Sequence, residues 1–132
     1  MNDNEFLTLV ATRSGLPSEQ AAAATRATLT TLAERIDGGE ARDLAGRLPS
    51  GLRAHAFGAG EAAERFGLDV FVARVAGRAG LDGDRARDGV AAVFDVLRDA
   101  LDPTAYEQVV GHLPGEYADV VDQSTPFVRR RA

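Results

Sequence analysis

The chain has 132 residues, 45% of them hydrophobic and 27% charged, and its formal net charge is −5. Such a balance is typical of a globular protein and not of a disordered chain. The sequence contains no cysteine, which excludes disulfides, thiol catalysis and thiolate metal sites, and its acidic balance is poorly suited to binding nucleic acid.

No apolar run approaches the roughly 20 residues that a membrane-spanning helix needs. The first residues, Met1–Glu5, lack the basic start and the apolar stretch of a signal peptide. We therefore expect a cytoplasmic protein that does not bind a membrane.

Apolar residues recur at helical spacing in the first half of the chain, and four helices are predicted there. The first covers Glu5–Ser14, and the second, longer helix covers about Ser18–Ile36. The third opens at Asp37 and ends before Pro49, because proline cannot continue a helix. A short fourth helix follows and carries Leu52.

The second half of the chain repeats this order. Helices are predicted over Val70–Ala79 and over Gly83–Leu101. The third begins after Asp102, with a proline at its first position, where the missing N–H costs nothing. Pro114 starts a short fourth helix that carries Tyr117. No segment is typical of a β-strand, so the predicted fold class is all-α.

Local signals mark the ends of these helices. Asn4 and Asp69 precede the first helix of each half and are predicted N-caps. Gly15 and Gly80 follow the same helices and are expected to end them in the left-handed conformation. A helical turn is also considered for Glu61–Phe66, within the connector between the halves.

Two further glycines, Gly46 and Gly111, fall inside the predicted third helices. Glycine in a helix costs about 1 kcal/mol relative to alanine. We therefore expect both to permit a close approach between helices.

An internal repeat relates the two halves and is the most specific pattern in the chain. Shifted by 65 positions, Glu5–Ala54 lies over Val70–Asp119 without insertion or deletion. We expect two tandem ungapped four-helix units, residues 5–57 and 70–122, packed about a pseudo-twofold axis as one all-α domain over residues 1–123. A basic tail, residues 124–132, follows. The identical pairs are Phe6/Phe71, Val10/Val75, Ala11/Ala76, Arg13/Arg78, Gly15/Gly80, Leu16/Leu81, Ala21/Ala86, Ala27/Ala92, Leu32/Leu97, Asp37/Asp102, Gly46/Gly111, Leu48/Leu113 and Pro49/Pro114.

The repeated pattern resembles a bacterial family known as domain of unknown function 2267. Each half carries Phe-x3-Val-Ala-x-Arg-x-Gly-Leu, then a long helix, then a third helix that ends in Leu-Pro. The resemblance implies a small all-helical bacterial protein, and it transfers neither an activity nor catalytic residues. The residues that carry it are Phe6, Val10, Ala11, Arg13, Gly15, Leu16, Ala41, Leu44, Leu48 and Pro49, and Phe71, Val75, Ala76, Arg78, Gly80, Leu81, Val109, Leu113 and Pro114, with Tyr106 in place of the third-helix alanine.

Arg13 and Arg78 occupy equivalent positions of the repeat and are the first candidate functional residues. Each falls in the last turn of its helix, where the C-terminal dipole favours a cation. That structural role is the simpler interpretation. The alternative is that the two guanidinium groups form a pair that binds an anion or an acidic partner.

The remaining polar groupings predict no catalytic residue, cofactor or metal. The aspartates at Asp82, Asp84 and Asp88 lack the glycine and glutamate that a calcium loop places at its sixth and twelfth positions. They are interpreted as acids near a helix N-terminus. His55 and His112 have no nucleophile at a recognisable spacing, so we expect them at the surface or at a boundary.

Charge is distributed unevenly in the second half, which favours a protein partner. Residues 67–128 hold 5 arginines and 11 acids, and three arginines then close the chain. The tail is interpreted either as disordered or as a docking segment with an aromatic anchor. The candidate contact residues there and on the acidic half are Phe127, Arg129, Arg130, Arg131, Asp95, Asp99 and Asp119.

The leading functional hypothesis is therefore a non-enzymatic helical protein-interaction module with a regulatory or scaffolding role. The alternative is a small-ligand-binding protein with a pocket between the two repeats, where helical bundles commonly place sites. The similarity of the halves also allows a homodimer. An enzyme and a DNA-binding protein rank below these two interpretations.

Overall fold

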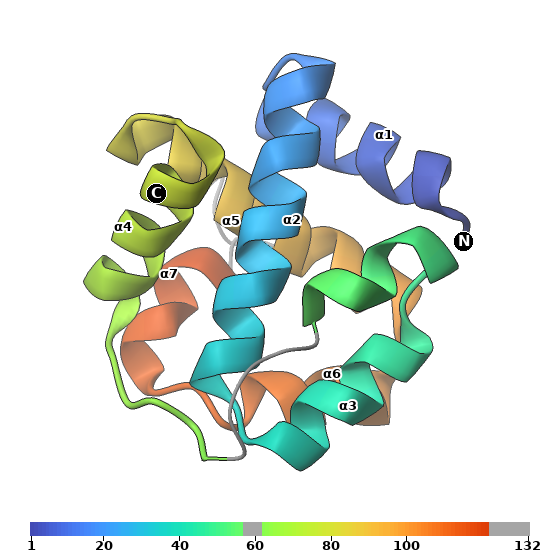
Figure 1. The fold of residues 1–132 in the computed structure, drawn as a ribbon, viewed down its shortest axis with the longest axis vertical. Helices are drawn as coiled ribbons and strands as arrows, with labels where there is room; N and C mark the ends of the chain where they lie inside the picture. The colour runs from blue at the N-terminus through green and yellow to red at the C-terminus, as the bar shows by residue number, and fades with distance from the viewer. Residues whose placement is uncertain (57–61, 122–132) are drawn as a thin grey trace, which may run out of the picture.

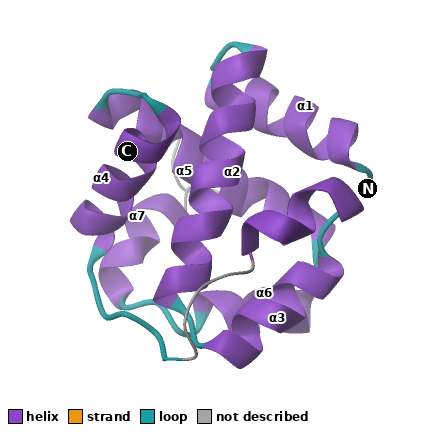
Figure 2. Ribbon diagram, in the orientation of Figure 1, coloured by secondary structure: helices purple, strands orange, loops and turns teal. Residues whose placement is uncertain are grey.

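A computed structural model describes residues 1–56 and 62–121 of the chain. Within these residues every regular element is a helix and no strand is present (Figure 2), which confirms the all-α prediction. The elements are α1 (Asp3–Ser14), α2 (Ser18–Arg35), α3 (Gly38–Arg47), the 3-10 helix η1 (Ser50–Ala56), α4 (Leu68–Ala79), α5 (Gly83–Ala100), α6 (Pro103–Val110), the 3-10 helix η2 (Gly115–Tyr117) and α7 (Ala118–Val121).

The first helix begins two residues earlier than predicted because Asn2, and not Asn4, caps it. The Asn2 side chain accepts a hydrogen bond from the Glu5 backbone N–H at 2.8 Å. The Glu5 carboxylate accepts in return from the Asn2 backbone N–H at 2.9 Å, which completes a capping box. Asn4 lies inside the first turn, so its predicted capping role is wrong.

The start of α4 also differs from the prediction. The helix begins at Leu68, which places Asp69 in the first turn and makes its predicted capping role wrong. The Leu68 backbone N–H donates instead to the carboxylate of Glu116, at 2.7 Å. The first backbone N–H of α4 therefore donates to a side chain 48 residues away in the sequence, and not to the neighbouring Asp69 that the sequence predicted as the cap.

The other predicted helix ends are confirmed. Gly15 and Gly80 follow α1 and α4 with φ angles of 76° and 70°, a conformation that costs glycine little. Asp37 and Asp102 cap α3 and α6, each accepting from the backbone N–H three residues further on, at 2.9 and 2.8 Å. The described part of the connector, residues 62–67, forms no helix, so the turn considered there is wrong for those residues.

The two long helices, α2 and α5, form the centre of the molecule (Figure 1). They contact each other, and each of them also contacts both α1 and α4. At one end, at the bottom of Figure 1, α3 and α6 contact one another. Among the described residues, no helix combines the length and the apolar character that crossing a membrane requires.

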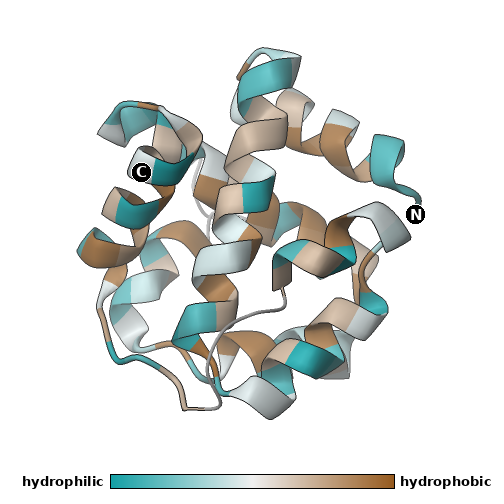
Figure 3. Cartoon of the chain, in the orientation of Figure 1, coloured by the Kyte–Doolittle hydropathy of each residue, from teal (hydrophilic) through white to brown (hydrophobic). Residues whose placement is uncertain are grey.

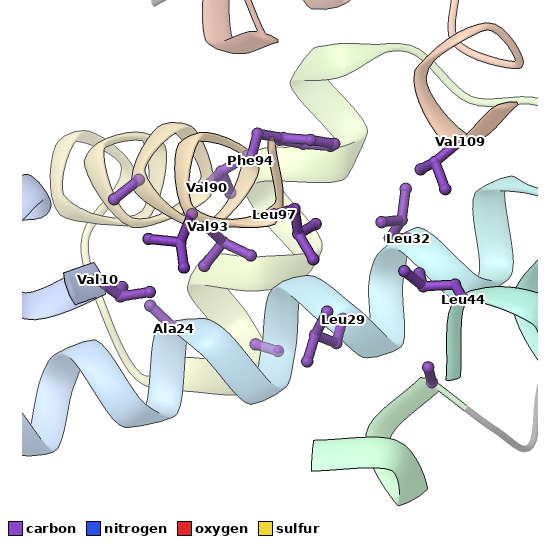
Figure 4. Packing of buried hydrophobic residues seen from close by; sticks show 14 of the residues in the cluster. Val10, Ala24, Leu29, Leu32, Leu44, Val90, Val93, Phe94, Leu97 and Val109 are labelled. Atoms are coloured by element: carbon purple, nitrogen blue, oxygen red, sulfur yellow. The ribbon is translucent and has the colours of Figure 1, made fainter. Parts of the chain in front are cut away.

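The core lies mainly between α2 and α5 (Figure 4). Val93 and Leu97 of α5 and Leu29 of α2 are fully buried and lie between the two helix axes. Hydrophobic and hydrophilic stretches alternate along the helices (Figure 3), as expected where one side of each is buried. Burial of each such leucine or phenylalanine stabilises the fold by roughly 1.5–3 kcal/mol.

The close helix approach occurs at a glycine that the sequence did not single out. A Cβ atom on Gly46 would have no atom within 4 Å, and Gly111 lies just beyond α6 and would meet only its own helix, at the Glu107 carbonyl. The prediction for Gly46 and Gly111 is therefore wrong. A Cβ atom on Gly89, in α5, would lie 2.7 Å from the Cβ of Ala24, in α2.

Candidate functional site

Arg13 projects from α1 across to α5, where it binds two carboxylates. Its Nη1 lies 2.7 Å from Asp95 Oδ2, and its Nη2 lies 2.7 Å from Asp99 Oδ2. Burial lowers the pKa of Arg13, but the hydrogen bonds and charges of Asp99 and Asp95 outweigh that effect and raise the pKa above its ordinary value. The candidate residue Arg13 is therefore paired with two of the candidate contact residues, Asp95 and Asp99.

Arg78 makes the corresponding contact from α4 to α2. Its Nη1 and Nη2 donate to the two carboxylate oxygens of Glu34, at 2.8 and 2.7 Å, and Nη1 also donates to the Thr31 hydroxyl at 2.8 Å. This bonding lowers the pKa of Glu34 against the opposing effect of desolvation, and Arg74 lowers it further. Arg74 Nη1 donates to the same carboxylate at 2.9 Å.

The two arginines bind separate carboxylates and not a shared site. Asp99 follows Glu34 by 65 positions, the same interval that separates Arg13 from Arg78. Each arginine thus joins the first helix of one half to the long helix of the other half. This geometry favours the structural interpretation of the pair over a joint grip on an anion.

The other predicted contact residues fall into two groups. Asp119, at the start of α7, forms an ion pair with Arg87 of α5 at 3.1 Å. The tail residues Phe127, Arg129, Arg130 and Arg131 lie outside the described residues.

A hollow with a volume of about 280 Å³ lies where α2, η1 and α4 meet. Most of its lining residues belong to α2, and η1 and α4 contribute one side chain each. Arg26 is exposed in it and forms no ion pair with any carboxylate in the described part of the chain. Cationic and hydrogen-bonding groups from both halves converge at this hollow. The lining residues are Ala23, Arg26, Ala27, Thr30, His55 and Arg78.

The half-buried His55 of the hollow is fixed through a hydrogen bond to its backbone carbonyl. The Thr30 hydroxyl donates to the His55 carbonyl at 2.9 Å, which ties η1 to α2. This hydrogen bond between α2 and η1, which are far apart in the sequence, therefore places the imidazole at the hollow. The second histidine, His112, lies elsewhere: its Nδ1 is 2.6 Å from the Gln108 carbonyl, and its Nε2 is 3.9 Å from Asp37.

A buried cation near the connector was missed by the sequence analysis. Arg35 is 5% exposed, and its Nε donates to the Phe66 carbonyl at 2.9 Å. The Tyr117 hydroxyl donates to the same oxygen at 2.9 Å, and burial raises the pKa of Tyr117. The guanidinium also lies over both aromatic rings, 5.9 and 5.8 Å from their centroids. Arg35 follows Leu32 at helical spacing on the buried stripe, a signal that indicates its burial but not its partners.

The cluster around Arg35 fixes the end of the connector to both halves of the molecule. Its carbonyl acceptor belongs to the connector, while the two donors come from α2 and η2. We assign it a structural role. Among the described residues, no group of three or more histidine or acidic side chains is arranged to hold a metal ion.

Fold and site together define an all-helical protein whose halves are joined by ion pairs between helices. The chain belongs to the family of uncharacterized conserved proteins called DUF2267, whose model matches residues 3–120. No curated protein matches the chain. Family membership, expected from the repeated sequence pattern, is thereby confirmed, and it brings no activity with it.

Proposed function

We propose that the chain consists of two tandem four-helix units that form one domain. The interval between corresponding helix starts supports this. α1 begins at Asp3 and α4 at Leu68, while α2 begins at Ser18 and α5 at Gly83. Both pairs are separated by 65 residues, the same interval as in the sequence repeat.

The contacts between helices further support a pseudo-twofold arrangement of the two units. A twofold operation that exchanges the units turns the α1–α5 contact into the α4–α2 contact, and both occur. It turns the α2–α5 and α3–α6 contacts into themselves, and these also occur. Equivalent residues meet on such an axis, as Ala24 and Gly89 do. Each unit then completes its core with helices of the other, so neither is expected to fold alone.

For the function, we propose a non-enzymatic helical protein-interaction module of a bacterial cytoplasm, with a regulatory or scaffolding role. The observation that carries this is an apolar groove of about 170 Å³ on α6, η2 and α7. It lies where the described chain ends, directly before the tail with Phe127 and its three arginines. The lining residues are Val110, Leu113, Pro114, Gly115, Tyr117, Ala118 and Val121.

The chemistry of this region selects the kind of partner. An apolar groove accepts an aliphatic or aromatic side chain, and desolvated anchors of that kind dominate binding energy. Arginines 129–131 pair best with carboxylates. We therefore propose a protein partner that presents an apolar side chain surrounded by acidic residues. A second copy of this chain, with its net charge of −5, is the homodimeric alternative.

Affinity capture with the full chain and two variants tests this proposal. One variant lacks residues 126–132, and the other carries Leu113→Asp in the groove. The control is Val70→Asp, which changes an apolar residue on α4 that is 43% exposed and does not line the groove. We expect a stoichiometric partner that both variants lose and the control retains, with reconstituted binding that weakens with salt. Equal recovery by all four proteins would contradict the module, and light scattering separates a partner from self-association.

A second candidate function is favoured by the hollow between α2, η1 and α4. Its position between the two units is where the alternative hypothesis placed a small-ligand pocket, and two basic side chains line it. A thermal-shift screen tests this function because a ligand that binds only the folded state raises Tm by mass action. The variant Ala23→Phe, which fills the hollow, serves as the matched control.

A further inference from the structure

We infer that the hollow lined by Arg26, Thr30, His55 and Arg78 binds the phosphate group of a small molecule. This inference rests on the second candidate function above and names its ligand chemistry. The volume, about 280 Å³, is close to the lower end of small-molecule pockets, which starts at roughly 300 Å³. A compact anion suits such a space better than an extended ligand.

Arg26 carries the strongest part of the argument because its charge is paired with no carboxylate among residues 1–56 and 62–121. Its helical neighbours three and four positions away are alanine, leucine and threonine, so no carboxylate on α2 reaches it. Arg13, Arg74 and Arg78, in contrast, each bind a carboxylate within 3.0 Å. An exposed guanidinium beside small side chains presents its donors to the hollow.

The second cation, Arg78, already uses some of its N–H donors within the protein. Its bonds to Glu34 and Thr31 use Nη1 and one donor of Nη2. A guanidinium has more N–H donors than these bonds use, so part of Arg78 remains available to a ligand. The bonds also hold the guanidinium still, which lowers the entropy cost of binding.

The number of directions from which donors arrive favours phosphate over carboxylate. A planar carboxylate is satisfied by one bidentate arginine. Here Arg26 comes from α2, His55 from η1 and Arg78 from α4, so donors reach the hollow from three separate elements. A tetrahedral oxyanion has acceptor oxygens in as many directions.

The equivalent positions in the second unit show that the fold does not demand this constellation. Ala91 and Val120 stand 65 residues after Arg26 and His55, and Asp88 stands at the position of Ala23. Of the polar lining residues, only the arginine that joins the helices, Arg13 or Arg78, is present in both units. Side chains that the architecture requires recur, whereas Arg26 and His55 occur once, at the hollow.

The test is a titration of the isotope-labelled full chain with inorganic phosphate, followed by NMR at an ionic strength held constant with sodium chloride. We expect saturable shifts confined to the hollow, including the Arg26 side chain and the Thr30 amide. Acetate should bind more weakly. Arg26→Gln should weaken phosphate binding at least tenfold, while Arg85→Gln, an exposed arginine of α5, should leave it unchanged.

Linear shifts spread over many arginines, or unchanged affinity in Arg26→Gln, would overturn the inference. Ala23→Phe adds an independent test, since it blocks the hollow without removing charge, and circular dichroism checks that each variant folds. If a neutral compound raises Tm and Ala23→Phe abolishes that rise while phosphate fails, the pocket stands and its phosphate chemistry is wrong. If neither phosphate nor any screened compound responds to Ala23→Phe, the second candidate function itself falls.

Discussion

Gly89 of α5 and Ala24 of α2 approach so closely that a Cβ atom on the glycine would lie 2.7 Å from the Cβ of the alanine. The two residues are 65 positions apart, the interval of the sequence repeat. Both residues are buried, and their contact sets how near the two central helices can lie. One of the equivalent positions must lack a side chain because two methyl groups do not fit.

Replacing this glycine should therefore destabilise the protein although alanine favours helices. Gly89→Ala gains about 1 kcal/mol of helix propensity, but it forces α2 and α5 apart, and overpacking of this kind costs about 1–3 kcal/mol. We expect a net loss of stability in urea denaturation. The control Gly46→Ala adds a methyl group with no atom within 4 Å and should be neutral or stabilising. A gain of stability in both variants would contradict the close approach.

A second prediction concerns Thr28, a fully buried threonine of α2. Its Oγ1 has no hydrogen-bond partner within the described residues. A buried hydroxyl without a partner keeps its desolvation cost, so Thr28→Val should stabilise the protein by about 1 kcal/mol. The control is Thr25→Val, since the equally buried Thr25 hydroxyl donates to the Ala21 carbonyl at 2.8 Å. Thermal unfolding should separate the two variants, and equal losses of stability would contradict the assignment.

Helix positions were predictable from sequence because their signals are local. The start of α2 at Ser18 and of α5 at Gly83, and the left-handed ends at Gly15 and Gly80, follow from spacing and from residue type. The N-cap of α1 was harder to predict from the sequence. Asn2 and Asn4 are both good caps, and only Asn2 has a glutamate three residues later to complete a capping box.

The candidate site was much less predictable because its residues share no spacing. Arg26, His55 and Arg78 come from three elements, and only the packing of η1 and α4 on α2 brings them to one hollow. The contact of Glu116 with the start of α4 was also unpredictable, because the two are distant in the sequence and meet only through packing. Asp95 and Asp99 were predicted as contacts for another protein, and the structure pairs both carboxylates with Arg13.

A third prediction follows from the bond between Arg78 and Glu34. Because Arg78 lowers the pKa of Glu34 in the folded protein, the unfolded chain binds the proton more readily. The contribution to stability is therefore complete above the ordinary glutamate pKa of about 4.5, and it disappears as the pH falls through the folded pKa. In Arg78→Gln we expect lower stability at pH 7, by about 1 kcal/mol, and a smaller further loss on acidification.

Urea denaturation between pH 7 and acidic pH measures this difference. The control is Arg85→Gln, because Arg85 lies 3.8 Å from Asp82 and both side chains are largely exposed. Its stability should follow that of the unmodified protein at every pH. Parallel curves for Arg78→Gln and the unmodified protein would show that the pair contributes nothing to the pH dependence.

A fourth prediction has the opposite sign and concerns Asp88 on α5. Its side chain is exposed, but partial desolvation raises its pKa, and the nearby charges of Asp84 and Asp82 raise it further. The ionised side chain therefore costs stability at neutral pH, and this cost disappears as the pH falls through the raised pKa. Asp88→Asn should stabilise the protein at pH 7 by about 0.2–0.5 kcal/mol, the size of a like-charge pair four residues apart. The gain should shrink on acidification.

The control for Asp88→Asn is Asp84→Asn, because Asp84 lies one turn nearer the start of α5. Asp84 lies in the first turn of α5, where the helix dipole favours a negative charge and offsets the repulsion from Asp88. Asp84→Asn should therefore gain less than Asp88→Asn at pH 7. A loss of stability in Asp88→Asn at pH 7, or a gain that stays constant as the pH falls, would show that repulsion and desolvation do not govern this carboxylate. The difference between the two variants then measures how far the favourable helix field extends into α5.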